Sequence, residues 1–152
     1  MWVPKVLPGL SAVTVRHLSC GDAFAACLSD RGILLTFGSG QHGVLGHRNM
    51  DDIEQPKIVE ALLGFEIRSV VCGASHVVAI TTDSEVYSWG CGGNGRLGSG
   101  ATLDLNVPRP VVGITPEDHI STVVCGIDST MFLSSDGPIY ACGSNKCAER
   151  HK

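Results

Sequence analysis

The chain has 152 residues, a length typical of one domain, and it contains 43% hydrophobic and only 17% charged residues. Its net charge of −4 and the lack of a basic stripe argue against a nucleic-acid partner. No stretch approaches the roughly 20 apolar residues of a membrane span, so we expect no membrane partner either. The 19 glycines suit short strands and tight turns better than long helices.

Several residue types recur along the chain with a period of about 52. Pro4, Pro56 and Pro108 mark the period, and a Cys-Gly pair and then a glycine 18 residues after the cysteine follow each of them. These markers are Cys20-Gly21, Cys72-Gly73 and Cys125-Gly126, followed by Gly38, Gly90 and Gly143. A period near 50 residues predicts a repeat architecture. We therefore divide the chain into repeats 4–55 and 56–107, an incomplete repeat 108–145 and a divergent tail 146–152.

Each copy contains three short apolar runs separated by glycine or aspartate. In chain order they lie within 17–38, 70–90 and 123–143, with hairpin-like joints at 30–32 and 136–137. Such runs, rich in Val, Ile and aromatic residues, read as strands. A fourth short strand is expected to begin at the proline, as at 4–7 and 56–59, because proline is permitted at a strand's first residue. One-turn helices are expected around 61–63 and 116–118.

The resulting fold class is all-β. Four short antiparallel strands per repeat are the pattern of propeller blades. We expect a partial β-propeller with about two complete four-stranded blades and an incomplete third.

The three cysteines of the repeat, Cys20, Cys72 and Cys125, are flanked by apolar residues and are expected to be small buried side chains. The odd total of seven cysteines favours a reduced, cytoplasmic or nuclear setting over a disulfide framework. His76 follows Cys72 by four residues, where the other copies carry Phe24 and Ser129, so we expect it to be a hydrogen-bonded structural residue.

Two segments, Gly38–Gly43 and Gly90–Gly95, match the G-x-G-x-x-G pattern of nucleotide-binding loops. A dinucleotide site needs a helix after the motif, and here Leu-Gly and a polar loop follow. Both segments fall at the same phase of the repeat, which favours turn glycines with positive φ. A kinase would need a lysine after the Val-Ala-Ile run at 78–80, where Thr81 stands, together with His-Arg-Asp and Asp-Phe-Gly sequences, which do not occur.

We expect no catalytic residues and no cofactor in this chain. Cys142, Cys147 and His151 form a possible but incomplete zinc pattern, because zinc sites usually have four well-placed ligands, and we expect no metal.

The segments 71–76 and 86–98 resemble an RCC1 (regulator of chromosome condensation) repeat, and the resemblance extends from Pro4 to Gly143. It rests on a Cys-Gly-x-x-His element and an aromatic-Gly-x-Gly-x-x-Gly-x-Leu-Gly element. The structural repeat positions are Cys20, Gly21, Gly38, Gly43, Gly46, Cys72, Gly73, Trp89, Gly90, Gly95, Gly98, Cys125, Gly126 and Gly143. Within this family the amino-acid sequence is most similar to the RCC1 region of NIMA-related (Nek) serine/threonine kinases, including their ciliary members.

The resemblance implies a regulatory, protein-binding module located in the cytoplasm, at the cilium or the centrosome, with a kinase domain as a possible partner in cis. ATP and magnesium would belong only to such a kinase domain. An alternative, by analogy with the founding RCC1 protein, is guanine-nucleotide exchange on a small GTPase. Loops on a rigid scaffold commonly carry binding function, so the candidate partner-binding residues are Gln41, His42, Asn94 and Arg96 in loops 40–47 and 92–99.

The repeat pattern departs from the family after Asn145, where Arg150-His151 stands in place of a Leu-Gly pair. Family propellers have seven blades, and three blades would leave apolar inter-blade faces exposed. Exposed apolar faces mark association sites, so we expect self-association through open blade edges.

Overall fold

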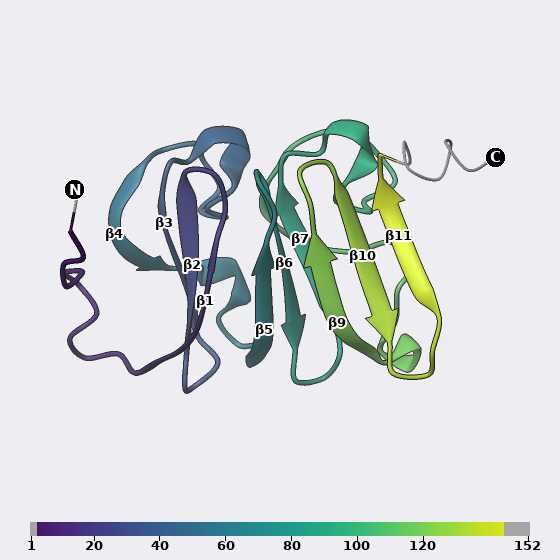
Figure 1. Cartoon of the computed structure of the whole chain (residues 1–152), viewed down its shortest axis with the longest axis horizontal. Coiled ribbons are helices and arrows are strands. Elements are labelled where there is room, and N and C mark those ends of the chain that lie inside the picture. The colour runs from purple at the N-terminus through teal and green to yellow at the C-terminus, as the bar shows by residue number, and fades with distance from the viewer. Residues whose placement is uncertain (1–2, 145–152) are drawn as a thin grey trace.

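A computed structural model describes residues 3–144, which form three antiparallel sheets standing side by side (Figure 1). The first sheet contains β1 (Val15–Cys20), β2 (Phe24–Ser29), β3 (Leu34–Gly38) and β4 (Ile53–Ile58), in that order. The second contains β5 (Ile67–Cys72), β6 (His76–Thr81), β7 (Val86–Gly90) and β8 (Leu105–Pro110). The third contains β9 (Ile120–Cys125), β10 (Ser129–Ser134) and β11 (Ile139–Gly143). The 3₁₀ helices are η1 (Gln41–Gly43), η2 (Glu60–Leu62), η3 (Gly93–Gly95) and η4 (Pro116–Asp118).

The sheets confirm the expected all-β fold of two four-stranded blades and a third with three strands. The one-turn helices expected near 61–63 and 116–118 are also present, as η2 and η4. The expected strand at 4–7 is wrong, because those residues have no strand conformation. Pro56 does not begin a strand either: it lies inside β4, which pairs with β3 of the first blade. Proline is tolerated there because β4 is an edge strand. The repeat boundaries set from the sequence remain predictions.

The hydrophobic core lies between the sheets. One buried cluster joins the first and second blades and includes Phe24, Leu28, Ile67, Val77 and Trp89. A second cluster joins the second and third blades. Because the apolar faces of neighbouring sheets cover one another, each blade depends on its neighbour for its stability.

Polar contacts between blades repeat with the same offset as the sequence. The Arg16 side chain donates to the Ile67 carbonyl at 3.2 Å, and Arg68, 52 residues later, donates to the carbonyl of Ile120. The backbone N–H of Asp22 donates to Ala74 O at 2.9 Å, and that of Ala74 donates to Gly126 O at 3.3 Å. The sequence period is therefore the period of the inter-blade contacts.

The repeat cysteines correct one expectation. Cys20 is exposed, and Cys72 and Cys125 are only half-buried at the residue level. The thiol of Cys72 lies 3.6 Å from the carbonyl oxygen of Ser19, and that of Cys125 lies 3.9 Å from the carbonyl oxygen of Val71, each on the preceding blade. Burial raises the pKa of both thiols to about 12. Cys20 lacks such cover because it belongs to the first sheet of the described structure.

The strand directions place the loops at two ends of the blades. The loop after β3 and the loop after β7 lie at one end, and the β2–β3 and β6–β7 turns lie at the other (Figure 1). Within the described part of the chain, no helix has the length and apolar character that crossing a membrane requires.

Candidate inter-blade site

The two glycine motifs form matching turns at one end of the blades. In the first, Gly38 and Gly43 have φ of 112° and 70°, and in the second Gly90 and Gly95 have φ of 107° and 74°. The middle glycines serve close packing: a Cβ on Gly92 would lie 1.9 Å from the carbonyl oxygen of Leu103. These geometries confirm the interpretation of both motifs as turns.

The donors that a phosphate would need are already used inside the loops. Gly40 N–H donates to Asp52 Oδ1, and Gly92 N–H donates to Asp104 Oδ1, both at 2.9 Å. The accompanying helices η1 and η3 have three residues each and are of the 3₁₀ type. Neither loop therefore presents the open helix N-terminus that a nucleotide-binding loop uses.

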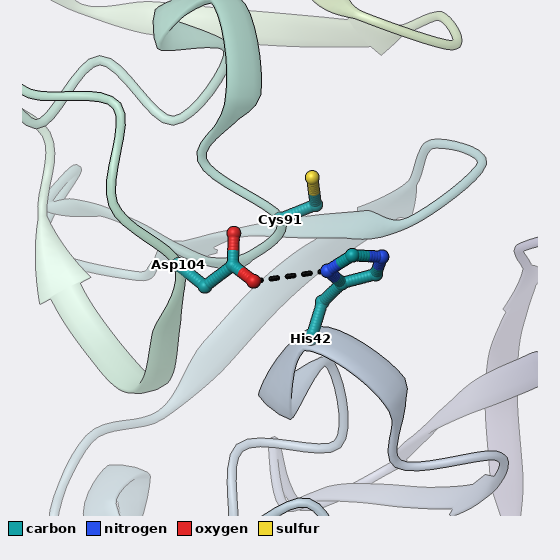
Figure 2. Close-up of side chains that lie close together, drawn as sticks. All are labelled: His42, Cys91 and Asp104. Carbon is teal, nitrogen blue, oxygen red and sulfur yellow. Dashed lines mark hydrogen bonds and ion pairs between the residues drawn. The ribbon is translucent and has the colours of Figure 1, made fainter.

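The first loop reaches across to the second blade and brings three reactive side chains together (Figure 2). His42 in η1 approaches Asp104, which precedes β8, and Cys91, which follows β7. The Nδ1 atom of His42 lies 2.9 Å from Asp104 Oδ2. The donor atoms of the three residues lie within 4.8 Å of one another.

Burial alone would raise the pKa of Asp104. The Gly92 N–H, His42 and the Cys91 thiol outweigh that effect and lower it, so the carboxylate form is favoured. His42 and Asp104 are partly exposed, with side-chain exposures of 36% and 47%. The cluster is thus an accessible set of nitrogen, sulfur and oxygen donors at the junction of two blades.

The four candidate partner-binding residues have different environments. Gln41 and Asn94 are exposed on their loops, and His42 belongs to the inter-blade cluster. Arg96 is turned toward the protein: its Nε donates to Gly93 O at 2.8 Å and its Nη1 to Ile127 O of the third blade at 2.9 Å. Arg96 and His42 therefore each make a side-chain contact with the following blade, whereas Gln41 and Asn94 are exposed.

His76 is the structural residue that the sequence predicted. It is fully buried, and its Nε2 lies 2.8 Å from Thr130 Oγ1. The Thr130 hydroxyl donates its proton to Arg96 O at 2.7 Å, so Nε2 of His76 is the donor in the other bond. Burial and, secondarily, the Arg96 charge lower the pKa of His76 to about 4.

Two residues of the cluster were not anticipated from the sequence. Cys91 occupies the variable position of a glycine motif, and Asp104 lies 62 residues after His42. The 52-residue offset between Asp52 and Asp104 could have identified Asp104 as a repeated aspartate of the loop, but it does not show that His42 lies beside it. Of the other possible zinc ligands, Cys147 and His151 lie outside the described residues, and the Cys142 thiol contacts Arg96 O at 3.4 Å.

Comparison with known proteins identifies these repeats. The family described as "Regulator of chromosome condensation (RCC1) repeat" matches residues 31–80 and 83–133. The chain belongs to the RCC1-repeat family. Among solved structures, yeast RCC1 (Prp20) in its complex with Kap60 shares the fold, with a TM-score of 0.77 at 23% identity. The match covers 91% of this chain and 32% of that protein.

Two relatives are kinases that contain RCC1 repeats similar to these. Serine/threonine-protein kinase Nek8 of Danio rerio is 50% identical over 145 residues, covering 95% of this chain and 21% of that kinase. Serine/threonine-protein kinase Nek9 of Mus musculus is 37% identical over 148 residues, covering 94% and 15%. The chain spans about a fifth or less of these relatives, and a kinase domain is not evident in it.

Proposed function

We propose that this RCC1-repeat chain is a non-catalytic regulatory and protein-binding module of a NIMA-related serine/threonine kinase. The observation that carries the proposal is the 50% identity with Nek8 over 95% of the chain. The cytoplasm, and within it the cilium or the centrosome, is the proposed location. Its proposed partners are proteins, among them a kinase domain in cis.

The proposed binding surface is the end of the blades that carries the two glycine loops. Gln41 and Asn94 are exposed there, while the strands below them are held by the inter-blade cores. A rigid scaffold that presents exposed loops is suited to recognition, since little conformational entropy is lost on binding. Asn94 has a φ of 61°, so its side chain is displayed from a fixed left-handed turn.

A binding experiment with a purified NIMA-related kinase domain tests the proposal. The full 152-residue chain is immobilised, and binding of the kinase domain is followed by biolayer interferometry. We expect saturable binding that weakens at least about 10-fold in the double variant Gln41→Ala/Asn94→Gly, as for loss of a binding hot spot. Glycine at position 94 keeps the positive φ, so the variant changes the side chain and leaves the turn intact.

The matched control is Asp83→Ala, in the exposed β6–β7 turn at the opposite end of the second blade. It should bind like the unmodified chain. Failure of the kinase domain to bind would contradict the proposed partner. Acceleration of nucleotide release from a small GTPase by the chain would support the exchange-factor alternative instead.

A further inference from the structure

We propose that the junction between the first and second blades binds a Zn²⁺ ion through His42 Nδ1, Cys91 Sγ and the Asp104 carboxylate. The three donor atoms lie within 4.8 Å of one another and come from loops of two different blades (Figure 2). The site lies at the same end of the blades as the proposed binding surface, but the inference does not depend on the proposed kinase partner, because it concerns how adjacent blades are held together.

The donor set selects the class of metal. Mg²⁺ and Ca²⁺ prefer oxygen ligands, and neither uses thiolate or imidazole as a normal ligand. Zn²⁺ binds thiolate sulfur, imidazole nitrogen and carboxylate oxygen, commonly with three protein ligands when one position is left for water. One donor of each kind is present here.

Only small movements would complete the coordination. With Zn–N and Zn–O bonds of about 2.1 Å, a tetrahedral site separates nitrogen and oxygen by about 3.4 Å. The present separation of His42 Nδ1 and Asp104 Oδ2 is 2.9 Å, so the metal would replace this hydrogen bond with a slight opening. The Cys91 Sγ atom lies within 4.8 Å of the other two donor atoms, and a tetrahedral site would place it about 3.6 Å from them, so a side-chain adjustment of at most about 1.2 Å is needed.

The carboxylate is already oriented for this role. Asp104 Oδ1 accepts the Gly92 N–H at 2.9 Å, which fixes the carboxylate plane and leaves Oδ2 toward His42. Such an outer contact is typical of metal-binding carboxylates. The side chains of His42 and Asp104 are partly exposed, so water from solvent can reach the fourth coordination position.

Within residues 3–144, the combination of these three donors is found at this junction alone, and the fold does not require it. Asn94 takes the place of His42 in the second blade, and Ser39 and Ser144 take the place of Cys91 in the first and third. Only the aspartate recurs, as Asp52, where it performs the same capping of a glycine N–H. Histidine and cysteine therefore meet at the junction of the first two blades; the third copy has Cys147 at the position of His42, outside the described residues.

These neighbouring residues also supply variants that preserve the fold. Cys91→Ser and His42→Asn each introduce the side chain that another repeat carries at the same backbone position. Asparagine is suited to the φ of 63° at position 42, because Asn94 has a φ of 61°. Loss of metal binding in these variants can therefore be separated from loss of structure, which circular dichroism checks.

The experiment titrates the reduced full chain with Co²⁺, and then with Zn²⁺ in competition with a chromophoric chelator. We expect one equivalent of metal and a thiolate-to-cobalt charge-transfer absorption. Cys91→Ser should abolish that absorption, and His42→Asn should retain it in part. Each variant should weaken Zn²⁺ binding at least about 10-fold, since even outer-shell changes cost 10–100-fold.

Two cysteine controls exclude other thiol sites. Cys20→Ser removes the exposed cysteine of the first blade, and Cys147→Ser removes one outside the described residues. Both variants should bind metal like the unmodified chain. Zn²⁺ should raise the melting temperatures of the unmodified chain and of these two variants, but not the melting temperature of Cys91→Ser. The proposal is overturned if the unmodified chain binds no metal, if Cys91→Ser and His42→Asn keep its affinity, or if the absorption disappears in Cys147→Ser instead.

Discussion

The buried His76 makes the stability of the chain sensitive to mild acid, and its contacts with the third blade define a variant that should remove this sensitivity. The ring is enclosed, and its Nε2 donates to Thr130. The Nδ1 atom is buried without a hydrogen-bond partner, so protonation there would place a charge where nothing can solvate it. At the first junction the equivalent residues are Phe24 and Val77, which belong to one apolar cluster. The double variant His76→Phe/Thr130→Val therefore introduces the chemistry of the first junction into the second.

The size of the effect follows from the pKa of His76, about 4 in the folded chain against 6.5 in the unfolded chain. Because the folded pKa is lowered, the unfolded chain binds the proton more readily between pH 6.5 and 4. The stabilisation by neutral His76 is complete above pH 6.5 and is lost as the pH falls toward 4. Proton linkage gives a loss of about 2 kcal/mol between pH 7.5 and pH 5.0 and about 3 kcal/mol by pH 4.

Urea unfolding at pH 7.5 and pH 5.0 measures this loss. The unmodified chain should show a difference about 2 kcal/mol larger than that of the double variant, whatever the variant's stability at pH 7.5. Other titrating groups are shared by the two proteins, and they include His47, whose pKa is lowered by burial and by Lys57. His119→Asn, which removes an exposed histidine, should retain the unmodified difference. Equal pH dependence in the unmodified chain and the double variant would refute the assignment of the effect to His76.

Three further predictions follow from the contacts between blades. Gly73→Ala should destabilise the chain by about 1–3 kcal/mol, as overpacking does, because the new Cβ would lie 2.6 Å from Gly126 O. The control Gly126→Ala should change the unfolding free energy by less than about 0.5 kcal/mol, because the atom nearest to its new Cβ is 3.3 Å away. Equal costs in urea unfolding would contradict this. Cys20 should react with iodoacetamide much faster than Cys72 or Cys125, because it is exposed while the thiols of the other two have a pKa of about 12. Peptide mass spectrometry measures the three rates, and equal rates would contradict the prediction. Exposed apolar residues on the third blade, such as Val124 and Met131, should make the chain self-associate as its concentration rises. Light scattering after size-exclusion chromatography measures the molar mass, and a monomer at every concentration would contradict the role of open blade edges as association sites.

The fold was largely predictable from the sequence because each repeat is defined by patterns among residues that are close together in the chain. Short apolar runs, hairpin glycines and the 52-residue period are properties of neighbouring residues, and they predicted the three sheets and the two helices η2 and η4. The prediction that Pro56 is a strand's first residue is wrong, because a local pattern does not show which sheet an edge strand joins. In the structure its strand completes the preceding blade.

The candidate site was less predictable, because local sequence patterns do not show which segments meet in the folded chain. The sequence predicts His42 as a loop residue, whereas its approach to Asp104 and Cys91 depends on the packing of one blade against the next. The sequence by itself determined the repeating backbone, since glycine φ preferences and strand patterns act within a few residues. Only the tertiary structure decided the surroundings of equivalent residues. Cys20, Cys72 and Cys125 share one repeat position, yet their exposure differs because burial there depends on the neighbouring blade.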